Sequence, residues 1–259
     1  MRYINPNKLN TIKLNKDNFY VLIDFDRTLT KGDSISCWRV LYYSNLLGEN
    51  FQNEYDKIHD KTFPKEHESK KIKKKAYSDR FKEYMELLKQ NNFNNDIVKK
   101  AVRGTDLQLR DGAKEFLNKM YQMNIPVIIV SCSIGNVLEE YLKFKDCYYD
   151  NIYVYANYFD NNGNHICNVT PNNKNEIAFS KEVKDKISNR EYILLLGDII
   201  DDINMVSEEK LSSTITVGFL DKKIEQNMEV YRNTFDIVLT EHSSFDEVEE
   251  IIQVKNFGR

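Results

Sequence analysis

The fold is decided by residues 20–30, which read Tyr-Val-Leu-Ile-Asp-Phe-Asp-Arg-Thr-Leu-Thr. The continuous apolar run Val21–Ile23 predicts a strand buried on both faces, as in a parallel sheet. It ends in Asp24, and Asp26 and Thr28 follow at every second position. Carboxylates beside a buried strand must be paired, protonated or bound to a metal, and ligands of open α/β sheets collect at the carboxyl ends of strands. Asp24 and Asp26 are therefore candidate site residues, although an Asp-x-Asp can also be a strand-end turn.

Composition narrows the classes of function. The chain has 259 residues with 37 Lys and Arg against 40 Asp and Glu, so its net charge of -3 gives no overall attraction to a nucleic acid polymer. The four cysteines are widely spaced and form no Cys-x-x-Cys pair, which argues against a structural zinc or redox motif. The amino-terminal residues lack an apolar segment, and no later run approaches the roughly 20 apolar residues that span a bilayer. We expect a cytoplasmic protein without a membrane partner.

Strand-like and helical patterns alternate along the chain. Further apolar runs predict strands at 127–130, 152–155, 193–196, 215–219 and 235–239. Amphipathic stretches between them predict helices at 113–121, 137–142, 175–187 and 222–231. This alternation predicts an α/β fold with a Rossmann-like, doubly wound parallel sheet.

Residues 33–105 interrupt the alternation. They contain no strand-like run, and their apolar and aromatic side chains recur at helical spacing. We expect an all-helical insertion, with a catalytic core made of residues 1–32 and 106–259. The lysine-rich run 70–75 is predicted to be a solvated helix face.

A β-hairpin is predicted in the second half of the chain, around Asn162-Gly163. His165 lies just past this dipeptide, and we expect it to be an exposed turn residue.

Polar residues also follow the strand predicted at 127–130. Ser131, Cys132 and Ser133 end this run, and a helix is predicted to open at residues 134–136. The unpaired N–H groups of a helix start can bind phosphate. A serine that merely caps the helix is an equally good interpretation of this motif alone.

Three acids, Asp198, Asp201 and Asp202, follow the strand predicted at 193–196. Three acids beside one buried strand indicate a hard cation held by oxygen ligands. Lys174 is expected at the start of the preceding helix, where it could also be one solvated lysine among many.

The order of these motifs resembles that of haloacid dehalogenase-like phosphohydrolases. In detail the chain is similar to the cytosolic pyrimidine 5'-nucleotidase (5'-nucleotidase III) family, through residues 131–140, 195–202, 217–220 and 235–239. The similarity covers about residues 20 to 250 and is weak in the helical insertion. Such insertions in this superfamily are caps, which cover the site and select the substrate.

The resemblance implies hydrolysis of a phosphate monoester through an aspartyl-phosphate on Asp24, with Asp26 as general acid and base. It implies Mg²⁺ as cofactor, bound by Asp24, the Asp26 carbonyl and Asp198, with Asp202 supporting the metal site. The implied phosphate-binding group comprises Thr28, which steadies its loop, and Ser131, Cys132 and Lys174. The role of Asp201 stays open.

Two residues depart from the family pattern. Arg27 stands where the superfamily often has glycine, and we expect its side chain to point away from Asp24. Ser133 stands where this family usually has glycine, and it could narrow the phosphate loop.

The substrate is less constrained than the reaction. Tyr77, Asp79, Phe81 and Tyr84 occur near where the family places residues that grip a nucleobase, although each could serve helix packing alone. The leading hypothesis is a 5'-nucleotidase that acts on nucleoside monophosphates. The alternatives are a phosphatase of another small metabolite, such as a phosphoserine-like compound or a sugar phosphate, and a catalytically silent binding protein. The presence of every core motif residue argues against the silent protein.

Overall fold

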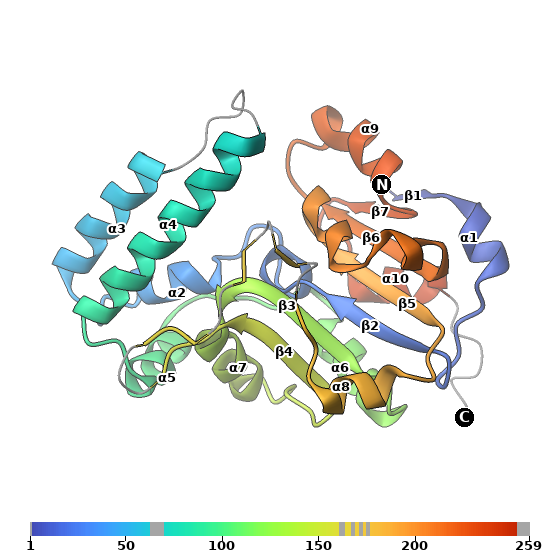
Figure 1. Cartoon of the computed structure of the whole chain (residues 1–259), viewed down its shortest axis with the longest axis horizontal. Helices are drawn as coiled ribbons and strands as arrows, with labels where there is room; N and C mark the ends of the chain where they lie inside the picture. The colour runs from blue at the N-terminus through green and yellow to red at the C-terminus, as the bar shows by residue number, and fades with distance from the viewer. Residues whose placement is uncertain are drawn as a thin grey trace.

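The computed structural model describes residues 2–62, 70–160, 164–166, 169–170, 173–174 and 177–252. Its sheet has seven strands in the order β1-β7-β6-β5-β2-β3-β4 (Figure 1). The strands are β1 (Arg2–Ile4), β2 (Phe19–Ile23), β3 (Val127–Ile134), β4 (Ile152–Asn157), β5 (Tyr192–Gly197), β6 (Thr214–Leu220) and β7 (Ile237–Thr240). Strands β2 to β7 pair in parallel, so the predicted doubly wound parallel sheet is confirmed. The short edge strand β1, antiparallel to β7, was not predicted.

Helices cover both faces of the sheet. They are α1 (Pro6–Thr11), α6 (Ala113–Gln122), α7 (Gly135–Phe144), α8 (Lys181–Ile187), α9 (Ile224–Thr234) and α10 (Phe245–Ile252). Alternate residues of β2 point to opposite faces, as strand geometry requires. Val21 and Ile23 pack in the cluster that includes residues of α6, α7 and α10, whereas Tyr20 and Leu22 pack in the cluster that includes residues of α8 and α9.

The register of the central strands positions the candidate site. Ile23 of β2 lies opposite Leu196 of β5 on one side and Ile129 of β3 on the other. The residues that follow these three strands therefore emerge together, because parallel strands share one carboxyl edge.

Helix α8 is shorter than the predicted helix at 175–187. It begins at Lys181, after Ser180 accepts a hydrogen bond from the Val183 N–H with its side chain. Residues 175–176 lie outside the described part of the chain. Lys174 therefore precedes the helix by several residues and does not start it, which corrects the expectation from the sequence.

The structure describes four helices within residues 33–105: α2 (Cys37–Tyr43), α3 (Glu49–Thr62), α4 (Lys70–Gln90) and α5 (Asn95–Gly104). The described residues of 33–105 form no strand. Helices α3 and α4 lie side by side and project away from the carboxyl edge of the sheet, and α5 packs on α7 (Figure 1). We call residues 33–105 the cap, and its separation from the core as a domain stays a prediction. Within the predicted solvated run, Lys71 and Lys75 are exposed.

The structure describes residues on both sides of the predicted hairpin turn. Phe159 and His165 form an antiparallel bridge, while the Asn162-Gly163 turn lies outside the described residues. His165 is half-buried between the rings of Phe81 and Phe159, so the expectation of an exposed turn residue was wrong. No helix in the described ranges is long and apolar enough to cross a membrane.

Candidate active site

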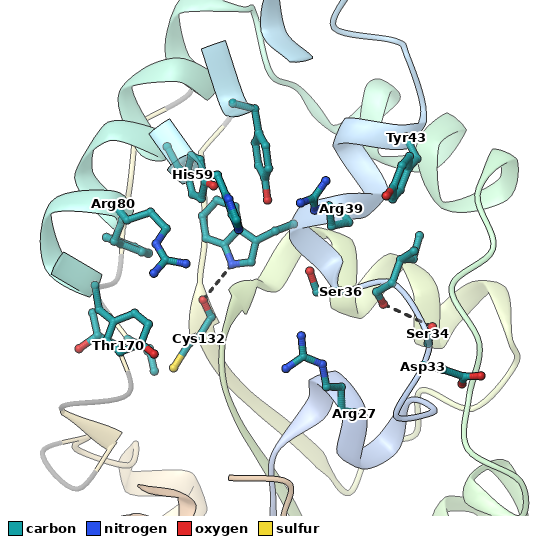
Figure 2. A pocket seen from close by; sticks show the side chains of 17 residues that line it. Arg27, Asp33, Ser34, Ser36, Arg39, Tyr43, His59, Arg80, Cys132 and Thr170 are labelled. Atoms are coloured by element: carbon teal, nitrogen blue, oxygen red, sulfur yellow. Dashed lines mark hydrogen bonds between the residues drawn. The ribbon is translucent and has the colours of Figure 1, made fainter. Parts of the chain in front are cut away.

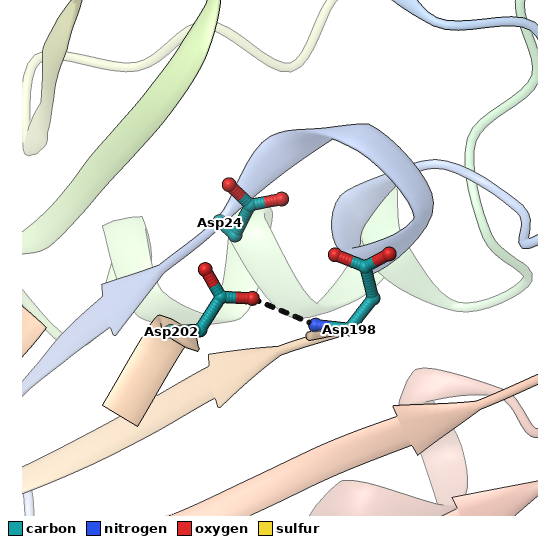
Figure 3. Close-up of side chains that lie close together, drawn as sticks. All are labelled: Asp24, Asp198 and Asp202. Atoms are coloured by element: carbon teal, nitrogen blue, oxygen red, sulfur yellow. Dashed lines mark hydrogen bonds between the residues drawn. The ribbon is translucent and has the colours of Figure 1, made fainter. Parts of the chain in front are cut away.

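Three carboxylates meet at the carboxyl edge of the sheet (Figure 3). Asp24 follows β2, and Asp198 and Asp202 follow β5. One oxygen from each lies within 4.8 Å of the others. Asp24 and Asp202 are buried and Asp198 is half-buried. An oxygen-only set of this kind fits a hard divalent cation.

Lys174 neutralises part of this charge. Its Nζ donates to Asp24 Oδ1 at 2.5 Å and to Asp202 Oδ1 at 2.7 Å, and the residue is only 4% exposed. Burial alone would lower the pKa of Lys174, but the two carboxylates outweigh it and raise that pKa well above its usual value. Lys174 therefore stays protonated between two acids that follow different strands.

One lysine does not balance three acids. Burial raises the pKa of Asp24 to about 7, against the opposing effect of Lys174. Burial, with the charges of Asp24 and Asp202 added, raises the pKa of Asp198 well above its usual value. A cation bound among these acids would favour their ionised forms.

Asp202 shapes the loop that carries Asp198. Its Oδ2 accepts the N–H groups of Asp198 at 3.0 Å and Ile199 at 3.1 Å. A Cβ on Gly197 would lie 2.4 Å from the Cβ of Asp202, so this close approach needs a glycine. Both oxygens of Asp202 are thus engaged by protein donors, as suits a residue that supports a metal site.

Asp26 is held by two donors from different segments. Its Oδ1 accepts the N–H of Cys37 at 3.1 Å, at the start of α2, and its Oδ2 accepts the hydroxyl of Ser133. Burial raises the pKa of Asp26, while the Ser133 hydrogen bond opposes the rise. This use of Ser133 was not predicted from the sequence, which suggested only a narrower loop.

The other predicted phosphate-binding residues lie around the same edge. Ser131 is buried in β3, and its Oγ accepts the N–H of Ser133 at 3.1 Å. The Cys132 carbonyl accepts the indole N–H of Trp38 at 3.3 Å, which ties α2 to β3. Thr28 Oγ1 is buried and has no hydrogen-bond partner among the described residues. Phosphate binding by these residues stays a prediction.

The backbone of Arg27 has a conformation that suits glycine, the residue that the resemblance would lead one to expect at this position. Its φ of 65° lies in the left-handed region, which a residue without a Cβ adopts most readily. Its guanidinium Nη1 lies 4.0 Å from Asp198 Oδ2. The side chain therefore reaches Asp198 in the acidic cluster, and its orientation away from Asp24 stays a prediction.

Arg110 stabilises the loop that carries Asp26. The sequence did not single out this residue. Arg110 is 2% exposed. Its guanidinium donates to the carbonyls of Thr28 (3.0 Å), Arg27 (2.5 Å) and Ser243 (3.1 Å) and to Asp221 Oδ2 (2.7 Å). An isolated arginine in a polar stretch carries no periodic signal, so only the structure identifies it.

We expect Arg110→Met to lower the free energy of unfolding by about 3–5 kcal/mol, because it leaves Asp221 buried without its cation. Urea denaturation measures this change. The matched control is Arg103→Met, since Arg103 is exposed and lies 3.8 Å from Glu140. Exposed pairs contribute roughly 0–1 kcal/mol. Equal losses in the two variants would contradict the assigned role of Arg110.

A cavity of about 470 Å³ lies between the cap and the core (Figure 2). It borders the acidic cluster through Arg27 and Cys132. Of the four predicted cap residues, Tyr77, Phe81 and Tyr84 line it and Asp79 does not. The sequence did not single out the remaining cap residues of the lining, which are Asp33, Ser34, Ile35, Ser36, Trp38, Arg39, Tyr43, Tyr55, His59 and Arg80.

Comparison with known proteins identifies relatives that are similar in sequence over most of the chain. The 7-methylguanosine phosphate-specific 5'-nucleotidase A of Xenopus laevis is 28% identical over 254 residues, covering 92% of this chain and 88% of the relative. The corresponding human enzyme is 28% identical over 253 residues, covering 92% and 84%.

Two solved structures share the fold. A cytosolic 5'-nucleotidase IIIB bound to cytidine superposes with a TM-score of 0.80 at 24% identity, covering 98% of this chain and 92% of that one. A probable phosphoserine phosphatase from Vibrio cholerae gives a TM-score of 0.65 at 14% identity, covering 95% and 67%. The sequence profile described as Pyrimidine 5'-nucleotidase (UMPH-1) matches residues 25–255. The chain therefore belongs to the pyrimidine 5'-nucleotidase family, a family of phosphomonoesterases.

Proposed function

We propose that this protein is a Mg²⁺-dependent 5'-nucleotidase that removes phosphate from nucleoside monophosphates. The observation that carries the proposal is the arrangement of Lys174 between Asp24 and Asp202, beside Asp198 and next to a cavity under the cap. The names of the relatives, which are nucleotidases, and the cytidine bound to one similar structure favour a nucleotide over other phosphate esters. The names of two cytosolic nucleotidases also support the proposal of a cytoplasmic location.

Asp24 is the proposed nucleophile. Its carboxylate oxygen attacks phosphorus, the bond from phosphorus to the ester oxygen breaks, and an aspartyl-phosphate forms. Water then attacks the same phosphorus, which releases inorganic phosphate and restores the carboxylate. The covalent intermediate divides one difficult displacement into two easier ones.

Asp26 is the proposed general acid and base. It gives a proton to the leaving ester oxygen in the first step and takes one from water in the second. Burial raises its pKa, which favours the protonated form that the first step needs. The Cys37 N–H and the Ser133 hydroxyl hold the carboxyl group in place for both transfers.

Positive charge is needed because a phosphate dianion repels the Asp24 carboxylate. Lys174 supplies one charge directly at Asp24. Mg²⁺, held by Asp24, Asp198 and the Asp26 carbonyl with Asp202 in support, would supply the rest of the electrostatic stabilisation. We assign the non-bridging phosphate oxygens to Lys174, Ser131 and the backbone at Cys132, with Thr28 steadying the loop.

Phosphate release from a panel of esters tests the proposal. The panel contains nucleoside 5'-monophosphates, phosphoserine and a sugar phosphate, each measured with Mg²⁺ and with a chelator. We expect cleavage of nucleotides in Mg²⁺ and its loss after chelation, since charge on the phosphate is then no longer compensated. A preference for phosphoserine or the sugar phosphate would support the second candidate, another small-metabolite phosphatase. No cleavage of any ester would favour the catalytically silent protein.

A further inference from the structure

The cavity under the cap has an unusual charge for a site that would hold an uncharged nucleobase. Three arginines line it: Arg27 from the loop after β2, Arg39 from α2 and Arg80 from α4. Figure 2 shows their side chains approaching the cavity from these three elements. Asp33 is the only acidic residue in its described lining, and it is exposed. The described lining therefore holds more cationic than acidic side chains.

Arg39 is the best placed of the three for a ligand. Its guanidinium lies over the rings of Tyr42, Tyr55 and Tyr43, at 4.9, 5.3 and 5.8 Å from their centroids. Within the described ranges this guanidinium forms no ion pair or hydrogen bond. The Asp56 carboxylate in the same cluster accepts the Tyr42 hydroxyl at 2.7 Å.

Stacking fixes the position of this guanidinium and leaves its donors available. An arginine packed on aromatic faces keeps its N–H groups in the guanidinium plane, where they match the two oxygens of a carboxylate or phosphate. A half-buried cation without a counterion is costly, so an anionic ligand group would be favoured there. In the proposed function, Lys174 and the metal ion that the acidic cluster would hold already bind the phosphate that is hydrolysed.

We propose that the cap end of this cavity binds a second anionic group of the substrate, with Arg39 as the specificity-determining residue. The substrate class is a nucleoside 5'-monophosphate that carries a further carboxylate or phosphate on its base or sugar. This inference rests on the proposed function and narrows it. It also predicts a substrate that differs from the 7-methylguanosine phosphate in the names of the relatives. The 7-methylguanine base is a cation, and like charges repel.

Four esters distinguish the possible sources of the second anion. They are uridine 5'-monophosphate, orotidine 5'-monophosphate with a carboxylate on the base, uridine 3',5'-bisphosphate and 7-methylguanosine 5'-monophosphate. With Mg²⁺ present, we expect kcat/KM for the orotidine ester or the bisphosphate to exceed that for the uridine monophosphate by about tenfold or more, through a lower KM. The 7-methylguanosine ester should be the poorest of the four.

Arg39→Gln should reduce that selectivity ratio to about threefold or less, and Arg39→Lys should retain an intermediate ratio because it keeps the charge without the bidentate fork. The lysine variant also covers the case in which the glutamine variant fails to fold, which circular dichroism would reveal. The matched control is Arg232→Gln, since Arg232 also stacks on a tyrosine, Tyr3 at 4.9 Å, but does not line the cavity. It should keep the wild-type ratio.

The outcomes separate this inference from the proposed function. Cleavage of nucleotides without preference for a second anion would overturn the inference and leave the nucleotidase standing, as would a preference for the 7-methylguanosine ester. An equal loss on all four esters in Arg39→Gln and Arg39→Lys would also overturn it, since selectivity would then not depend on Arg39. Failure to cleave any of the four in Mg²⁺ would instead remove the nucleotidase proposal itself.

Discussion

Asp24→Asn is expected to lower kcat by on the order of 10⁴-fold or more, because a neutral amide cannot form the aspartyl-phosphate. Asparagine has nearly the same shape, and its amide oxygen can still accept the hydrogen bond that Lys174 donates at 2.5 Å. The loss should therefore come from chemistry and not from unfolding. Steady-state phosphate release in Mg²⁺ measures the activity, and thermal denaturation checks that the variant is folded.

The matched control for this substitution is Asp201→Asn. Asp201 lies in the same acidic run as Asp198 and Asp202 but is not one of the three clustered carboxylates. Its activity should stay within about twofold of the wild type, because the Asp201 carboxylate is not one of the groups assigned to the metal or to the phosphate. If Asp24→Asn retained appreciable turnover while Asp201→Asn did not, the nucleophile would have to be reassigned to another carboxylate.

Much of the fold could be predicted because its central strands are buried on both faces. Such strands produce continuous apolar runs, as in Val21–Ile23, which stand out from an amphipathic helix. Strand β1 has no such run, because it is three residues long and partly exposed at the edge of the sheet. The start of α8 was misplaced because the mixed polar and apolar residues at 175–180 suit a helix as well as a loop, and only the Ser180 cap decides between them.

The candidate site also contains residues that the sequence could place and residues that it could not. Asp24 and Asp198 could be placed together because parallel strands end at one edge. The bond between Ser133 and Asp26 joins residues 107 positions apart, and Arg110 donates to a carbonyl 82 positions away. No local pattern specifies such contacts, because they depend on how the cap and the loops pack. The charge of the cavity depends likewise on which faces of α2 and α4 turn inward.

Lys174→Met is expected to lower both the stability and the activity strongly. It removes the cation that joins Asp24 and Asp202, and both carboxylates would stay buried without it. Removing one partner of a buried ion pair lowers the free energy of unfolding by about 3–5 kcal/mol. Activity should fall on the order of 10³-fold, because a charge aimed at the phosphate is lost. Urea denaturation without added metal measures the first effect, and phosphate release the second.

Two further variants show whether this loss comes from the buried charge. Lys143→Met removes an exposed lysine that pairs with Glu139 at 3.0 Å, a pair of the kind that contributes about 0.3–0.5 kcal/mol. Asp202→Asn combined with Lys174→Met removes a negative charge as well, so it should recover part of the stability without recovering the activity. A loss in Lys174→Met no larger than that in Lys143→Met would mean that the two carboxylates are protonated or solvated without the lysine. The acidic cluster would then not depend on Lys174, and the charge balance assigned to the site would be wrong.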